Sequence, residues 1–173
     1  MTTGKIVKYS LSFILYFLIQ VFILKDLVLF GYAFCFLYVF FLLSLPHELP
    51  TIPLMLIGFF MGLFIDLFYD SLGMHTASAV LLGFLRNPWI QVNTPTGGYD
   101  DNVPPTLLNM GMGWFVFYSI PLILIHHLLF FYIDILGTDL YLPLVIRVSA
   151  SMAFTFVLGI IVQAVFYKKE RVL

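Results

Sequence analysis

Two apolar helices joined by a short turn are predicted for residues 58–86, which read GFFMGLFIDLFYDSLGMHTASAVLLGFLR. Every fourth residue of the first helix is a glycine or an aspartate: Gly58, Gly62, Asp66 and Asp70. This spacing places the four residues along one helix face. The two glycines form a G-x-x-x-G pair, which lets a second helix backbone approach closely inside a membrane.

Asp66 lies one turn inside the expected membrane boundary. A carboxylate without a partner costs at least about 2.5 kcal/mol at mid-bilayer, and somewhat less near an interface. The side chain must therefore face protein, water or a cation. Two interpretations stay open. Either the glycines pack helices together while Asp66 caps or hydrogen-bonds a neighbour, or this whole face is a docking or ligand site.

The second helix of the hairpin continues the pattern of small residues. Gly73 and Ala77 are four residues apart, as are Ala79 and Gly83. Arg86 then closes the helix at the expected membrane boundary. There it anchors the topology or, in the functional interpretation, contributes to a partner interface together with the glycine face.

The composition of the whole chain excludes a water-soluble fold. Hydrophobic residues make up 62% of its 173 residues and charged residues 10%, against about 45–50% and 25% in soluble domains. An aromatic content of 18% excludes a disordered chain. The net charge of −1 argues against nucleic-acid binding, which needs a basic face. Membrane lipid is the expected surrounding of a single integral domain, residues 1–173.

We expect an all-α, polytopic membrane protein, because a membrane-spanning helix needs about 20 apolar residues. The sequence contains six such stretches, at residues 9–24, 27–45, 51–69, 72–90, 110–136 and 140–167. Only Lys25-Asp26 separates the first two spans, and Pro88 either ends or kinks the fourth. The first stretch has no cleavage site of the signal-peptide type and leads directly into the second, so we interpret it as an uncleaved anchor.

The Lys and Arg residues near the span ends predict the orientation. Six spans place both termini on one side, with Lys5, Lys8, Arg86, Lys168, Lys169 and Arg171, whereas the other side clearly holds only Lys25. Basic residues collect on the cytoplasmic side. Both termini, and the polar loop at residues 91–109, are therefore expected in the cytoplasm.

Arg147 is the second unusual charge, because it lies about two turns inside the sixth span. Asp66 and Asp134 both lie near the same membrane boundary. We expect an intramembrane ion pair between Arg147 and one of these carboxylates, with Asp66 preferred because its helix carries the polar face. There are two alternatives. Arg147 binds a ligand, or its side chain only extends toward the membrane interface.

No catalytic or metal-binding motif is visible in the sequence. His126 and His127 are adjacent, so they point about 100° apart on a helix and cannot easily chelate one metal. Hydrogen bonding inside the bundle is the simpler interpretation. There is no G-x-x-x-x-G-K-[ST] phosphate loop, and the 91–109 loop is too short for a catalytic domain. We expect no enzyme, cofactor or metal.

The run from Gly58 to Arg86 resembles the rod shape-determining protein MreD family. That family shows a G-F-x-x-G-L-x-x-D helix, a short turn with glycine, and a small-residue helix that ends at a basic residue. The matching positions are Gly58, Phe59, Gly62, Leu63, Asp66, Gly73 and Arg86. The match covers about 29 residues. The long loop before the fifth span is a departure that the family pattern does not explain.

The resemblance implies a non-enzymatic component of the bacterial cell-elongation machinery in the inner membrane. Such a protein maintains rod shape by scaffolding peptidoglycan synthesis. MreC is the implied direct partner, while MreB and the RodA–transpeptidase complex are indirect ones. The implied six-helix fold is similar to the substrate-binding subunits of vitamin transporters. This likeness leaves an alternative function, a small-molecule binding subunit of a transporter, which would need a cavity lined by Asp66, His75 and Arg147.

Overall fold

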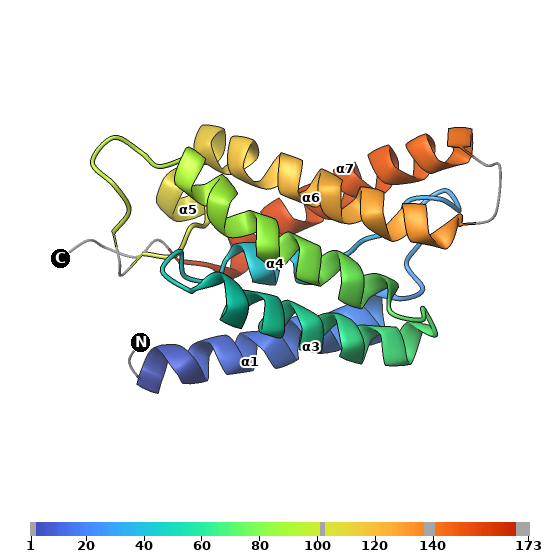
Figure 1. Cartoon of the computed structure of the whole chain (residues 1–173), viewed down its shortest axis with the longest axis horizontal. Coiled ribbons are helices and arrows are strands. Elements are labelled where there is room, and N and C mark those ends of the chain that lie inside the picture. The colour runs from blue at the N-terminus through green and yellow to red at the C-terminus, as the bar shows by residue number, and fades with distance from the viewer. Residues whose placement is uncertain (1–2, 101–102, 137–140, 169–173) are drawn as a thin grey trace.

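The computed structural model describes residues 3–100, 103–136 and 141–168, which form an all-helical bundle (Figure 1). Among them, four helices are long and apolar enough to cross a membrane: Thr3–Leu24, Thr51–Tyr69, Met112–Asp134 and Leu144–Phe166. The described residues form no β-strand, and the nearest feature is an isolated bridge between Leu29 and Ala33. The chain is therefore helical and apolar as its composition predicts.

Four of the predicted spans coincide closely with helices of the structure. These helices are α3 (Thr51–Tyr69), α4 (Met74–Val92), α6 (Met112–Asp134) and α7 (Tyr141–Phe166). The first residue of the last prediction, at position 140, lies outside the described residues. Pro88 lies inside α4 and does not end it. α4 is as long as α3 but more polar, so it is not among the four helices that qualify as spans by length and composition.

The first helix changes its winding before it ends. α1 covers Thr3–Ile19 and continues as a π-helical segment, η1, over Gln20–Leu24. Wider π-turns often occur where a helix has to re-aim a side chain. Here the buried Gln20 side chain turns into the bundle, and its Nε2 donates hydrogen bonds to the Cys35 carbonyl at 2.9 Å and the Tyr69 hydroxyl at 2.8 Å.

The prediction of a helical span at 27–45 is wrong. After η1 the chain makes a tight turn in which Phe30 and Gly31 have positive φ angles of 54° and 80°, and a short helix, α2, covers only Tyr38–Leu43. Every residue from 35 to 45 is buried. The segment is apolar because it forms the centre of the bundle, and hydropathy does not distinguish this position from contact with lipid.

Neighbouring helices supply the hydrogen bonds that residues 33–45, called the central segment below, lack. The backbone N–H of Phe34 donates to the Ser151 hydroxyl at 2.9 Å, and that of Phe36 donates to the Thr155 hydroxyl at 3.0 Å. Irregular backbone at membrane depth is tolerated only where it is buried in protein or lines a water-filled cavity. The hydroxyls of α7 therefore permit a non-helical core at this position.

The helices are arranged so that α1, α3 and α6 begin at one end of the bundle, where α4 and α7 end (Figure 1). We call this end the N-terminal end. A short helix, α5 (Leu107–Met110), precedes α6 there. Gln163 of α7 joins it to the core, because its Oε1 accepts from the Leu107 N–H at 2.8 Å while its Nε2 donates to the Ser44 hydroxyl at 3.1 Å.

Candidate functional site

Asp66 hydrogen-bonds the first turn of α4. Its Oδ1 accepts from the Ser71 hydroxyl at 2.5 Å and the His75 N–H at 3.0 Å, and its Oδ2 accepts from the Thr76 N–H at 2.9 Å and hydroxyl at 2.5 Å. A helix N-terminus is normally capped by its own N-cap side chain. Here the N-cap residue is Gly73, so the carboxylate of the preceding helix takes that role. The interpretation of Asp66 as a cap is confirmed.

The glycine face of α3 is occupied by α4. A Cβ atom at Gly58 would lie 2.7 Å from the Ala79 carbonyl oxygen, and one at Gly62 would lie 2.5 Å from the Thr76 Cα. The prediction of close helix packing is therefore confirmed for both glycines. At Gly58 and Gly62 the neighbour is therefore α4 of the same chain, and docking of a partner on the rest of this hairpin stays a prediction. Gly73 has another role, since its φ of +92° favours glycine while its surroundings are open.

Arg86 is fully buried inside the bundle, so its side chain is not exposed at the surface of this chain. Its guanidinium donates to the carbonyls of Leu43 at 3.4 Å, Pro46 at 3.4 Å and Leu45. These acceptors lie at the last residue of α2 and just after it, where a helix carries unsatisfied carbonyls and partial negative charge. Nε also donates to the Tyr118 hydroxyl at 2.8 Å. Arg86 thus joins the central segment to α4 and α6.

The ion pair of Arg147 forms with Asp134 and not with the preferred candidate, Asp66. Arg147 Nη1 donates to Asp134 Oδ2 at 3.0 Å, and the two side chains are 39% and 36% exposed. The preference was wrong because the Asp66 carboxylate is already used by four hydrogen bonds at the start of α4. The pair links the end of α6 to α7 at the edge of the bundle.

A double-mutant cycle should therefore give weak coupling between Asp134 and Arg147. For Asp134→Asn and Arg147→Gln we expect a coupling of about 0.2–1 kcal/mol, as for other exposed ion pairs. Asp66→Asn and Arg147→Gln should be additive, because these sites share no contact. Free energies of unfolding in detergent micelles provide the measurement. A larger coupling for Asp66 than for Asp134 would contradict the observed pairing.

The adjacent histidines of α6 make separate hydrogen bonds in the core. His126 Nε2 lies 2.6 Å from the Tyr38 hydroxyl, while His127 Nε2 lies 3.1 Å from the Thr155 hydroxyl. Within the described part of the chain, no group of three or more His, Cys, Asp or Glu side chains could hold a metal. The interpretation of these histidines as hydrogen-bonding residues of the bundle is confirmed.

Tyr38 connects two histidines that are far apart in the sequence. Its hydroxyl lies 2.6 Å from His126 Nε2 and 3.1 Å from His75 Nδ1. With its one proton, the phenol donates to one imidazole and accepts from the other. Both neutral rings therefore carry their proton on the same kind of nitrogen, either both on Nδ1 or both on Nε2. Sequence reasoning missed this link because it treated residues 27–45 as a regular membrane-spanning helix.

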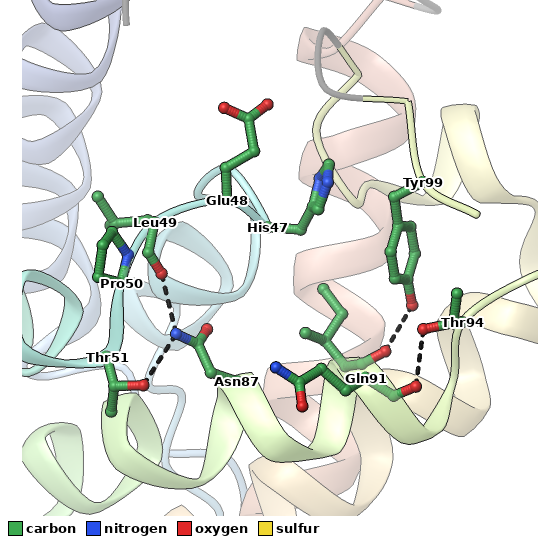
Figure 2. Close-up of a pocket in the computed structure, with 10 residues that line it drawn as sticks. His47, Glu48, Leu49, Pro50, Thr51, Asn87, Gln91, Thr94 and Tyr99 are labelled. Carbon is green, nitrogen blue, oxygen red and sulfur yellow. Dashed lines mark hydrogen bonds between the residues drawn. The ribbon is translucent and has the colours of Figure 1, made fainter.

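A pocket of about 440 Å³ opens at the N-terminal end of the bundle (Figure 2). It lies between the loop that precedes α3, the second half of α4 and the segment that follows α4. Its lining residues are His47, Glu48, Leu49, Pro50, Thr51, Asn87, Ile90, Gln91, Thr94 and Tyr99. Most of these side chains are polar, which distinguishes the pocket from the apolar surface of the bundle.

Hydrogen bonds hold two walls of the pocket in place. The Asn87 side chain donates from Nδ2 to the Leu49 carbonyl at 2.9 Å and the Thr51 hydroxyl at 3.1 Å, which ties the loop to α4. The Tyr99 hydroxyl donates to the Ile90 carbonyl at 2.7 Å. Partial burial raises the pKa of Tyr99 above its ordinary value.

Other side chains leave their functional groups at the opening. The rings of His47 and Tyr99 lie in contact, with 4.9 Å between their centroids and an angle of 37° between their planes (Figure 2). Gln91 extends from α4 between the walls, and Glu48 stands at the rim. Both Gln91 and Glu48 are exposed. The pocket thus combines a carboxylate, an amide and an aromatic wall.

Sequence reasoning had no basis for combining these residues, because they come from a loop, a helix and a second loop. One signal was available: Asn87 and Gln91 are four apart and therefore share a face of α4. Asp66, His75 and Arg147 do not form the cavity expected for a transporter subunit. Asp66 caps α4, His75 is buried and Arg147 pairs with Asp134.

No protein-family model, curated protein or solved structure matches this chain.

Proposed function

We propose that the chain is a non-catalytic, multi-pass membrane scaffold of the MreD type, which serves the bacterial cell-elongation machinery. One observation carries the proposal: the residues of the family-like pattern act together in one structural unit. Gly58 and Gly62 admit α4, Asp66 caps it, and Gly73 provides its left-handed start. Arg86 then fixes that unit to the central segment.

The use of the polar side chains supports a scaffold rather than an enzyme. The buried Asp66 and Arg86 each hold backbone groups of a neighbouring element. His127 bonds within the bundle, with Nδ1 at 2.8 Å from the Ile123 carbonyl. Groups committed to such bonds stabilise the fold and are not available for proton transfer to a substrate. Together, these internal hydrogen bonds make the bundle rigid and leave its outer surface apolar.

The proposed topology has six passages through the inner membrane, although the second is not a regular helix. The central segment starts beside the end of α1, near Lys25, and ends beside Arg86, so it runs the length of the bundle. With α4, this gives six passages and a fold comparable to the substrate-binding subunits of vitamin transporters. The N-terminal end then faces the cytoplasm, together with both termini.

The orientation predicts how a cysteine at the N-terminal end reacts. On a Cys35→Ser background, a Thr96→Cys variant should not react with a membrane-impermeant maleimide in intact spheroplasts, and it should react after lysis. Thr96 suits this test because it is exposed in the segment after α4. Leu72→Cys, at a fully exposed position in the opposite turn, is the matched control and should react in both cases. The reverse pattern would overturn the orientation.

Co-purification tests the proposed function. Affinity-tagged protein, extracted in mild detergent from cells that express MreC, should retain MreC, and a deletion strain should lose its rod shape and regain it with the wild-type gene. Cysteines placed along the outer faces of α1, α6 and α7 then map the contact by cross-linking. Absence of MreC, together with normal cell shape in the deletion strain, would contradict the proposal.

The pocket at the N-terminal end favours a second candidate, a small-molecule binding subunit of a transporter. Its volume of about 440 Å³ and its polar lining suit a small polar compound. This function requires that a defined compound remains with the purified protein, which native mass spectrometry would detect. It also requires a transporter ATPase in place of MreC as the co-purified partner.

A further inference from the structure

The pocket at the N-terminal end has the chemistry of a site for a basic side chain. Of its lining residues, all of which are described, Glu48 is the only Asp or Glu, and none is Lys or Arg. The Glu48 carboxylate is exposed at the rim, where a guanidinium or ammonium group can reach it. A cation has more to gain at this opening than an anion, which would meet the carboxylate first.

The remaining walls also suit a cation. The His47 and Tyr99 rings, whose planes are tilted by 37°, give an aromatic wall, and aromatic faces attract Arg and Lys. The hydrogen bond from the Tyr99 hydroxyl to the Ile90 carbonyl holds that wall in one orientation. The Gln91 amide, on the α4 side of the pocket, offers an oxygen acceptor. An arginine or lysine side chain could therefore pair with Glu48 at the rim and contact the aromatic wall.

An apolar groove adjoins this pocket. It has a volume of about 420 Å³ and lies between the first half of α1 and the stretch that runs from the end of α2 into α3. Its lining residues are Ile6, Tyr9, Ser10, Phe13, Ile14, Phe41, Leu45, Pro46, Leu49 and Ile57. Leu49 lines both hollows, so an apolar surface along the bundle continues over one loop into a polar, acidic site at its end.

We infer that the pocket binds the Lys/Arg-rich flank of a single-span membrane protein whose span packs in the apolar groove. The order of the two surfaces matches such a partner, because an apolar span is followed on its cytoplasmic side by basic residues. A free polyamine would use only the pocket and would leave the groove unexplained. The inference rests on the proposed function and its orientation, and it specifies which segment of the partner is bound and where.

The experiment uses the full chain in phosphatidylcholine vesicles, which carry no net charge to attract a basic peptide. The probe is a synthetic Leu-Ala span of about 20 residues preceded by Arg-Lys-Arg, and its counterpart has Gln-Gln-Gln instead. Association is measured by energy transfer to a dye on Thr96→Cys in the Cys35→Ser background. The basic peptide should associate about fivefold more tightly than the neutral one.

Glu48→Gln should remove this preference and leave the weaker, span-only association. Asp70→Asn is the matched control, because it neutralises an exposed carboxylate in the turn at the opposite end and asparagine tolerates the positive φ of 53° there. It should keep the full preference. An unchanged preference in Glu48→Gln would overturn the inference. The inference would also fail if spermine displaced the basic peptide and bound more tightly than the peptide, with a binding that depends on Glu48.

The same variants separate the inference from the proposed function. If Glu48 discriminates between the peptides but MreC does not co-purify, the proposed function fails and the basic-flank site stands. If MreC co-purifies while the peptides bind equally well to the wild type and Glu48→Gln, the site assignment fails and the scaffold function stands.

Discussion

Gly62→Ala is expected to reduce the accumulation and the melting temperature of the folded protein sharply, although it adds only one methyl group. The new Cβ would lie 2.5 Å from the Thr76 Cα and 2.6 Å from its backbone nitrogen. Because these are backbone atoms, relief requires that α4 move away from α3. That movement would pull the Thr76 N–H away from the Asp66 carboxylate. We expect a destabilisation of about 3 kcal/mol or more, at the upper end of overpacking effects.

The matched control is Gly113→Ala, which adds the same methyl group to α6. No heavy atom lies within 4 Å of the position that a Cβ would take at Gly113, and its backbone is not in the left-handed region. This variant should be neutral or slightly stabilised, since alanine is favoured over glycine in helices. Size-exclusion chromatography after heating compares the two. Equal melting temperatures for Gly62→Ala and the wild type would contradict the close approach of α3 and α4.

The hairpin of α3 and α4 could be predicted from the sequence because its signals are local. The four-residue spacing of Gly58, Gly62 and Asp66 indicates a shared helix face, and the short link after Asp70 forces the next helix back along it. The observed α3 has the predicted bounds, 51–69. What the spacing does not indicate is whether a glycine face meets a helix of the same chain or of a partner. Here the adjacent helix occupies it.

The central segment could not be predicted in the same way. Its apolar residues satisfy the rule for a membrane span, yet its hydrogen bonds come from Gln20, Ser151 and Thr155, which lie up to 119 residues away in the sequence. The sequence shows that polar side chains lie within apolar helices. It does not show which backbone groups these side chains bind. The pocket at the N-terminal end was missed for the same reason, since three separate segments line it.

Arg86→Met should be the most damaging substitution outside the glycine face. Methionine is apolar, unbranched and adaptable in shape, so it occupies much of the site but donates no hydrogen bond. The carbonyls of Leu45 and Pro46 and the Tyr118 hydroxyl would then lose their donor inside the bundle. Each bond to a charged donor contributes about 1.5–3 kcal/mol, so we expect a loss of at least 3 kcal/mol.

The single cysteine provides a readout of where this damage occurs. Cys35 lies in the central segment with 1% of its surface exposed, so it should resist thiol reagents in the native wild type. Arg86→Met removes the attachment at the far end of that segment and should make Cys35 reactive below the global unfolding temperature. Arg147→Met is the matched control, because it removes an arginine that is 39% exposed. It should cost about 1 kcal/mol or less and leave Cys35 protected. If Cys35 is equally protected in both variants, Arg86 does not hold the central segment in place.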